Sequence, residues 1–243
     1  RTFRVFVSST FSDLKEERNA LQAQVFPELR RLCEQHGARF QPIDLRWGVS
    51  EEAGLDQQAM KICLAEIRRC QAVSPRPNFI ILLGNRYGWR PLPAGIAAEE
   101  FERLQPHLAG EARRQVEDWY ALDANALPAV YYLRARTGEW IDPAAWYPLE
   151  AKLHAALEAA ALAAGLAEAD LVKYHASATE QEIIHGAIET MDAGEHIFCF
   201  SRETAGIPAT AAAGDFLDLA GGVPDASAQA ALQDLKTRLR RVL

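Results

Sequence analysis

The sequence predicts an α/β protein whose parallel sheet is covered by helices on both faces. Strand-like runs alternate with helical patterns near both ends of the chain, an order typical of sheets built by helical crossovers. In residues 78–83 (NFIILL), every position after Asn78 is apolar, which indicates a strand buried on both faces. We therefore expect one domain over residues 1–243.

The first third of the chain is expected to supply three strands and two helices. Ser12 or Asp13 can cap the first helix, Gly37 follows its end, and Pro27 should kink or break it. The expected elements are strands at 3–7, 39–44 and 78–83 and helices at 12–36 and 56–73.

Between residues 88 and 176 the alternation is lost. Leu149, Leu153 and Leu157 recur at helical spacing, which predicts the buried face of an alanine-rich helix. The block is much longer than an ordinary crossover of a dozen or more residues, so we interpret it as an insertion. It should also contain a helix at 99–122, broken near 106–110, and a short strand at 130–133.

The alternation returns near the end of the chain. A helix is expected at 179–191, a fourth strand at 196–200 and a loop at 205–225. Asp225 or Ser227 can cap a last amphipathic helix at 226–243. This helix is expected to lead to a further domain, and the start at Arg1 suggests a fragment of a longer protein.

Composition limits the classes of function. The 243 residues are 49% hydrophobic and 24% charged, which excludes a disordered chain. A net charge of −7 opposes binding to nucleic acid, and the longest apolar stretch is too short to span a membrane. The expected partners therefore include neither nucleic acid nor a membrane.

The four cysteines lack the spacing of a disulfide framework or a zinc site. They are Cys33, Cys63, Cys70 and Cys199, and none forms a Cys-x-x-C pair. The six histidines also lack metal-ligand spacing. We expect buried, reduced thiols in a cytoplasmic protein that holds no metal.

Polar and aromatic side chains follow three of the predicted strands. Ligands of open parallel sheets bind at the carboxyl ends of the strands. Hydroxyl groups at a helix N-terminus can bind a phosphate. An arginine can bind a pyrophosphate, and an indole ring can stack on a base. A structural interpretation stays open, in which the hydroxyls cap a helix, the arginines pair with acids and the indoles pack. The candidate binding residues are Ser8, Ser9, Thr10, Arg46, Trp47, Arg86, Tyr87 and Trp89.

Two glutamates open the helix before the fourth strand. Thr179 and Glu182 have the T-x-x-E spacing of a capping box, and Glu180 suits the dipole of the first turn. Neither a Gly-x-Gly-x-x-Gly run nor a P-loop is present, so no standard dinucleotide or P-loop site is predicted.

Three runs of the sequence together resemble a known family. They are RVFVSSTFSDL at 4–14, DLRWGV at 44–49 and LGNRYGW at 83–89. They are similar to the TIR-like domain that stands at the front of NACHT-type STAND ATPases, including telomerase-associated and NACHT–WD-repeat proteins and bacterial relatives. The resemblance implies a flavodoxin-like fold with strand order 2-1-3-4 and a fifth strand.

The resemblance also implies an activity. Catalytic TIR domains cleave NAD at the nicotinamide–ribose bond with one glutamate, and the run Glu182-Ile183-Ile184 resembles the run that carries it, which makes Glu182 the candidate catalytic residue. NAD would be the substrate, and no cofactor is expected. The tryptophan that often stands four residues before that glutamate is replaced by Ala178. A non-catalytic scaffold and an enzyme for another N-glycoside therefore stay open.

The resemblance further implies partners. We expect self-association through TIR-like surfaces, with the loop after the second strand covering the site, and NACHT/STAND ATPase and sensor regions on the same polypeptide. Immune or antiphage defence is the biological role that such an arrangement suggests.

Overall fold

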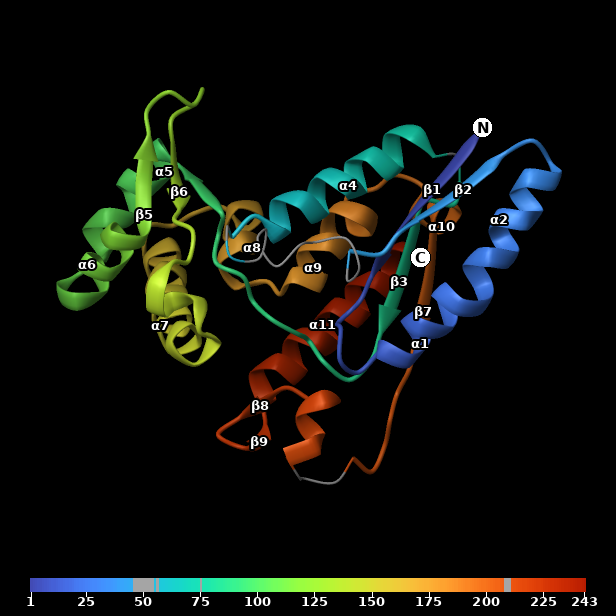
Figure 1. The fold of residues 1–243 in the computed structure, drawn as a ribbon. Coiled ribbons are helices and arrows are strands. Elements are labelled where there is room, and N and C mark those ends of the chain that lie inside the picture. Colours follow the sequence, from blue (N-terminus) through green and yellow to red (C-terminus); the bar gives the residue numbers. More distant parts are fainter. Residues whose placement is uncertain (46–54, 56, 75, 208–210) are drawn as a thin grey trace. The chain divides into compact units, whose positions relative to one another are not determined.

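The computed structural model describes residues 1–45, 55, 57–74, 76–207 and 211–243 (Figure 1). The chain divides into two compact units. The first, called the sheet unit, comprises Arg1–Gly48, Cys63–Trp89 and Ser177–Leu243. The second unit comprises Val49–Ile62 and Arg90–Ala176. Arg46 and Trp47, two of the predicted site residues, lie outside the described residues.

The sheet unit contains a parallel sheet of four strands in the order β2-β1-β3-β7. Phe6 of β1 pairs with Ile43 of β2 and with Phe79 of β3, which in turn pairs with Ile197 of β7. The predicted parallel sheet and the order 2-1-3-4 are confirmed, β7 being the fourth predicted strand. The described residues add no fifth strand to this sheet. The strands are β1 (Thr2–Ser8), β2 (Arg39–Ile43), β3 (Phe79–Leu83) and β7 (Ile197–Ser201).

Helices cover both faces of the sheet, as Figure 1 shows. Successive side chains of β3 point to opposite faces of the sheet, so Ile81 and Leu82 lie in two different hydrophobic cores, one on each face. One face carries α1 (Lys15–Ala20) and α2 (Phe26–Gln35). The other carries α4 (Ala59–Val73), α9 (Ala178–Ile183) and α11 (Ala226–Val242).

The first helical segment is interrupted before Pro27, as the sequence predicts. A π-helical turn, Leu21–Val25, separates α1 from α2, and Pro27 lies in the first turn of α2. Proline has no N–H to donate to the carbonyl four residues earlier, so a regular α-helix cannot continue through this position. A second π-helical turn, Ile184–Ile188, follows α9, and the short helix α10 (Ala193–His196) precedes β7.

The segment that was expected to be a loop after β7 contains regular structure. A 3₁₀ turn (Ala211–Asp215) is followed by a hairpin of β8 (Leu219–Ala220) and β9 (Val223–Pro224). Each strand has only two residues, which is too short for a pattern to reveal. Asp225 then caps α11 as predicted, because its side chain accepts hydrogen bonds from the backbone of Ser227 and Ala228 at 2.9 and 3.1 Å.

The second unit has its own antiparallel sheet, in the order β4-β6-β5. The helix expected to run to residue 122 ends at Trp119, because Tyr120–Asp123 pairs as a strand with β6. Trp146 and Leu153 of α7 lie in the core of this unit. The elements are β4 (Gly95–Ala97), α5 (Ala98–Leu104), a 3₁₀ turn (Gln105–His107), α6 (Gly110–Trp119), β5 (Tyr120–Asp123), β6 (Val130–Leu133), a second 3₁₀ turn (Gly138–Ile141), α7 (Pro143–Ala163) and α8 (Glu168–His175).

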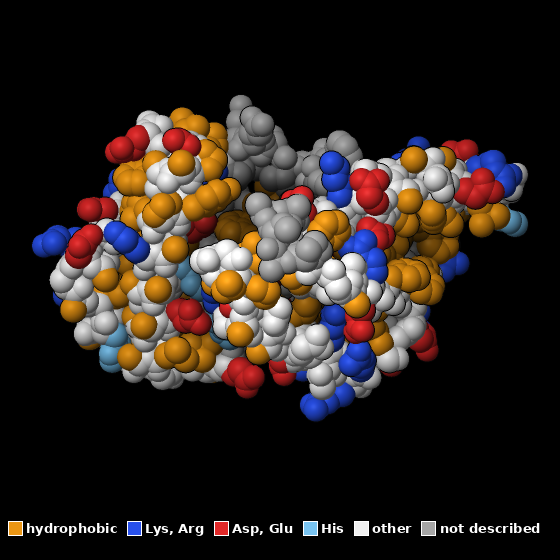
Figure 2. Space-filling model, turned by 90° about the horizontal axis from the view of Figure 1, so that it is seen from below, with side chains coloured by type: hydrophobic (Ala, Val, Ile, Leu, Met, Phe, Trp, Pro, Cys, Tyr) orange, Lys and Arg blue, Asp and Glu red, His pale blue; other side chains and the backbone are white. Residues whose placement is uncertain are grey.

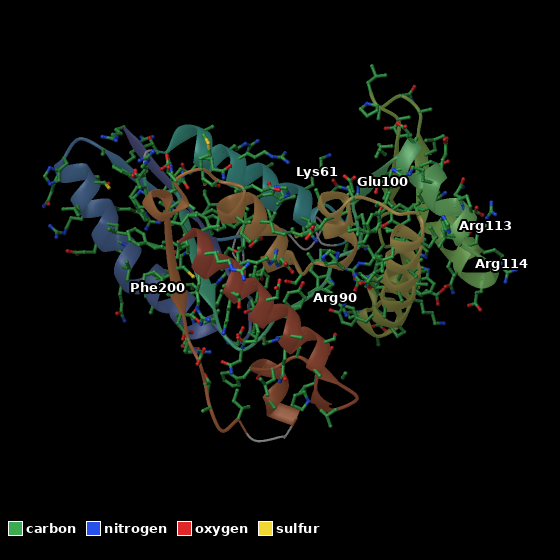
Figure 3. All side chains as sticks on the ribbon, turned by 180° about the vertical axis from the view of Figure 1, so that it is seen from behind. Lys61, Arg90, Glu100, Arg113, Arg114 and Phe200 are labelled. Atoms are coloured by element: carbon green, nitrogen blue, oxygen red, sulfur yellow. The ribbon has the colours of Figure 1, made fainter. Side chains whose placement is uncertain are left out.

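Charged side chains of both signs are intermixed on the face shown in Figure 2. Arg113 and Arg114 project outward from α6 (Figure 3), and the Arg113 Nε atom lies 2.8 Å from a carboxylate oxygen of Glu117. This is the geometry of a solvated helix face. None of the described helices is long and apolar enough to cross a bilayer.

Candidate functional site

The last residue of β1 and a glutamate of α9 meet at the carboxyl edge of the parallel sheet. The Ser8 hydroxyl donates a hydrogen bond to Oε2 of Glu182 at 2.6 Å, although the two residues are 174 positions apart in the chain. Ser8 is fully buried and Glu182 is 8% exposed. Of the predicted site residues, these two are therefore in direct contact. The Ser8 side chain is buried, and its hydroxyl contacts the carboxylate of Glu182.

Burial raises the pKa of Glu182 above its ordinary value of 4.5. Hydrogen bonds from the side chains of Ser8 and Cys63 and the positive charge of Arg18 act in the opposite direction, while the negative charge of Asp44 adds to the increase. The protein thus holds this carboxyl group in a poorly hydrated place where its charged form is costly. A cation placed beside it would favour the carboxylate.

The helix cap at the start of α9 differs from the predicted one. Ser177 is the N-cap residue, and its side chain accepts a hydrogen bond from the backbone of Glu180 at 3.2 Å. The predicted capping box of Thr179 and Glu182 is wrong, because the helix already begins at Ala178. Glu182 consequently lies beyond the capping positions, and its carboxylate is available for the contact with Ser8.

Ser9 and Thr10 take part in local hydrogen bonds. The Ser9 hydroxyl donates to the backbone carbonyl of Thr10 at 2.7 Å and accepts from Nε of Arg18 at 2.5 Å. The Thr10 hydroxyl donates to Asp13 at 2.5 Å. Burial raises the pKa of Asp13, and the hydrogen bond from Thr10 counteracts this in part. These contacts are structural, but they do not cap the first helix. The predicted cap by the Ser-Ser-Thr run, Ser12 or Asp13 is wrong, because Leu14 is the N-cap residue of α1 and no side chain accepts a capping hydrogen bond there.

Arg18 is a residue of this region that sequence reasoning missed. Its guanidinium lies 2.7 Å from Oδ1 of Asp44 and donates to the carbonyls of Val7 and Ser9, each at 3.3 Å. The side chain is 2% exposed, so it joins the end of β1 to the residue that follows β2 inside the protein. It stands four positions after Leu14, the N-cap residue of α1, and this helical spacing was a signal that it faces the core.

Tyr87 belongs to a second buried contact on α9. Its hydroxyl donates to a carboxylate oxygen of Glu180 and accepts from the backbone of Ser177 at 3.2 Å. The other carboxylate oxygen of Glu180 pairs with Arg238 of α11. Glu180, the alternative catalytic carboxylate, is therefore engaged between the β3 loop and the last helix.

Arg86 forms structural contacts. Its guanidinium pairs with Asp218 at 3.1 Å and also donates to the hydroxyl of Ser12. The other carboxylate oxygen of Asp218 accepts from the backbone of Tyr87 and Gly88 at 2.6 and 3.2 Å. Asp218 thus holds the loop after β3 through hydrogen bonds and an ion pair, and nothing in its sequence surroundings pointed to this role. Trp89 closes the loop and is 48% exposed.

The described residues contain no group of three or more His, Cys, Asp or Glu side chains that could hold a metal ion. The four cysteines are free thiols. Burial raises the pKa of Cys63 above its ordinary value, an effect that the negative charge of Glu182 strengthens. A thiol in this environment stays protonated and acts as a hydrogen-bond donor.

A family model described as a domain of unknown function, DUF4062, matches residues 4–140. The chain belongs to the DUF4062 family. It is 31% identical over 238 residues to the mouse NACHT domain- and WD repeat-containing protein 1, a match that covers 92% of the chain and 15% of that protein. It is 40% identical over 140 residues to the mouse NACHT and WD repeat domain-containing protein 2, covering 56% of the chain and 8% of the relative.

A shorter match links the DUF4062 chain to the rat telomerase protein component 1, with 37% identity over 91 residues, or 37% of the chain and 3% of that protein. The chain thus spans no more than 15% of the length of these three relatives. No solved structure matches it significantly. The predicted relationship to NACHT–WD-repeat and telomerase-associated proteins is confirmed, and the TIR-like identity stays a prediction.

Proposed function

We propose that this DUF4062 chain is a TIR-like effector that hydrolyses NAD at the nicotinamide–ribose bond, with Glu182 as the catalytic carboxylate. The observation that supports this proposal is the position of Glu182. It projects from α9 to the carboxyl edge of the parallel sheet, where Ser8 fixes one of its oxygens at 2.6 Å. That edge is where open α/β sheets bind their ligands.

The chemistry needs little more than a placed negative charge. When the bond between C1′ of the ribose and the pyridinium nitrogen breaks, the electron pair leaves with neutral nicotinamide, so no general acid is needed. Water then adds to C1′ and releases a proton. One carboxylate can stabilise the positive charge that develops on the sugar and orient its hydroxyls. The cationic nicotinamide riboside group would also favour the ionised form of a glutamate whose pKa is raised by burial.

The decisive experiment compares nicotinamide release by the wild-type protein, Glu182→Gln and Glu180→Gln, both in dilute solution and when the chains are artificially clustered. Glutamine preserves the volume and the hydrogen-bond acceptor at each position. We expect Glu182→Gln to abolish release and Glu180→Gln to retain it, because Glu180 is engaged by Tyr87 and Arg238. Far-UV circular dichroism verifies that both variants fold.

The opposite result would assign the chemistry elsewhere. If Glu182→Gln releases nicotinamide at the wild-type rate, Glu182 is not catalytic, and loss in Glu180→Gln would move the role to that residue. Competition with other N-glycosides separates an NAD hydrolase from an enzyme that acts on a related nucleoside.

A non-catalytic scaffold is the second candidate, and a specific observation favours it. Several predicted ligand-binding groups are engaged by the protein itself: Arg86 by Asp218 and Ser12, and Thr10 by Asp13. Such contacts stabilise a loop surface suited to self-association. The absence of NAD cleavage under all clustered conditions, together with concentration-dependent assembly in light scattering, would favour this role.

We also propose that the chain is one domain of a NACHT-type protein, in which α11 leads toward the ATPase region. The support is the similarity to the two NACHT and WD repeat proteins. In that arrangement, oligomerisation by the ATPase would bring copies of this domain together. The clustered and dilute arms of the NAD assay imitate these two states.

A further inference from the structure

A cavity of about 370 Å³ lies within the sheet unit, between the segments that follow β3 and β7 and helix α11. Its size is in the lower part of the range for small-molecule sites. It shares no residue with the cluster around Glu182. Its lining includes Glu203, Thr204, Gln229, Gln233 and Lys236.

Lys236 is the unusual member of this lining. The residue is only 4% exposed, yet its ammonium forms no hydrogen bond or ion pair with any residue that the structure describes. Lysine is almost never buried to this degree unless its charge is paired, because an uncompensated charge is costly away from water. Among the described residues, the buried side-chain atoms that lack a hydrogen-bond partner do not include the Lys236 amino group. This group therefore keeps contact with solvent.

The other polar groups of the lining complement an anion that also carries hydroxyl groups. Thr204 contributes a hydroxyl, and Gln229 and Gln233 contribute side-chain amides, which donate and accept hydrogen bonds. Glu203 is the one carboxylate in the lining. Lys236 also lines a neighbouring cavity of about 350 Å³, whose walls are mostly apolar and offer fewer hydrogen-bonding groups.

We infer that Lys236 forms the centre of a binding site for a small organic anion, whose phosphate or carboxylate group pairs with the Lys236 ammonium. Hydroxyl groups of the same molecule reach Thr204, Gln229 and Gln233. The site lies at the same edge of the sheet where β3 and β7 end, and it is independent of the proposed reaction at Glu182. Bound anion would join the β7 loop to α11.

The test is a titration of the ¹⁵N-labelled 243-residue chain with ribose 5-phosphate, inorganic phosphate, acetate and ribose, followed by amide NMR shifts. We expect either phosphate or acetate to shift the amides of Thr204, Gln229 and Gln233, and ribose alone to shift none of them. Lys236→Met should weaken anion binding at least tenfold, whereas Lys236→Arg, which keeps the charge, should weaken it less. The matched control is Lys152→Met, which removes an exposed lysine of the second unit.

The arms of the experiment separate the possible ligands. Tighter binding of ribose 5-phosphate than of phosphate supports an organic phosphate, and binding of acetate alone supports a carboxylate. Equal affinities of the wild-type chain and Lys236→Met, or shifts confined to other residues, would overturn the proposal. So would the absence of shifts with every anion. The wild-type shift map decides the question even if Lys236→Met fails to fold.

Discussion

Replacing Arg18 by methionine removes a buried guanidinium while keeping much of its aliphatic volume. Arg18 is 2% exposed, and its partner Asp44 lies 2.7 Å away with a side chain that is 1% exposed. The substitution leaves the Asp44 carboxylate inside the protein without this cation. It also removes the hydrogen bonds to the carbonyls of Val7 and Ser9 at the end of β1.

Removing one partner of a buried ion pair costs about 3–5 kcal/mol, mostly because the remaining charge is uncompensated. We therefore expect Arg18→Met to lower the unfolding free energy of the sheet unit by that amount. Replacing both partners, as Arg18→Met with Asp44→Leu, should recover much of the loss, since an apolar pair of similar volume is often as stable as the buried ion pair.

Hydrogen exchange of the β1 and β3 amides is the suitable assay, because it reports unfolding of the sheet unit separately from the second unit. Arg31→Met is the matched control: Arg31 forms an exposed pair with Glu28 on α2, and its loss should leave exchange unchanged. A loss below about 1 kcal/mol for Arg18→Met, or a double variant no more stable than the single one, would refute the reasoning.

Three further predictions follow from the sheet unit. Because burial raises the pKa of Glu182 above 4.5, its ionisation destabilises the fold as pH rises, so Glu182→Gln should equal the wild type in thermal stability near pH 4 and exceed it at pH 7. Equal melting temperatures at both pH values would contradict this. Gly186→Ala would place a methyl group 2.5 Å from the Phe79 ring and should cost about 1–3 kcal/mol in urea unfolding. Phe79→Leu should relieve part of that cost, and a fully stable Gly186→Ala would show that the ring can move. Ser177→Ala should cost about 1 kcal/mol as a lost N-cap, more than Thr179→Ala; the reverse order would restore the predicted capping box.

The parallel sheet could be predicted because local sequence and tertiary packing agree there. The run 79–83 is apolar at every position, and the structure buries it between two layers of helices. The start of α11 was equally predictable, since Asp225 caps its own neighbours through local hydrogen bonds. Such features depend on residues close together in the chain.

The missed features depend on contacts between distant residues. Tyr120–Asp123 continues a helical pattern but becomes a strand because β6 pairs with it. Asp218 accepts a hydrogen bond from the backbone of Gly88 in the loop after β3, although the two residues are 130 positions apart in the chain. Arg18 likewise pairs with Asp44, which follows a different element. In the candidate site, the resemblance of the run Glu182-Ile183-Ile184 to the TIR-like family made Glu182 a candidate, whereas its spacing predicted a cap. Its contact with Ser8 and its place beyond the helix cap depend on the fold.

The order of the segments along the chain has a consequence for synthesis on the ribosome. The last strand of the sheet, β7, lies 118 residues after its partner positions in β3, and residues 90–176 emerge between them. The second unit is complete once Ala176 has left the exit tunnel, while β1, β2 and β3 still lack an edge strand and α11. A nascent chain stalled before residue 197 therefore exposes the edge of β3, whose unpaired backbone N–H and C=O groups and apolar side chains invite pairing with other chains.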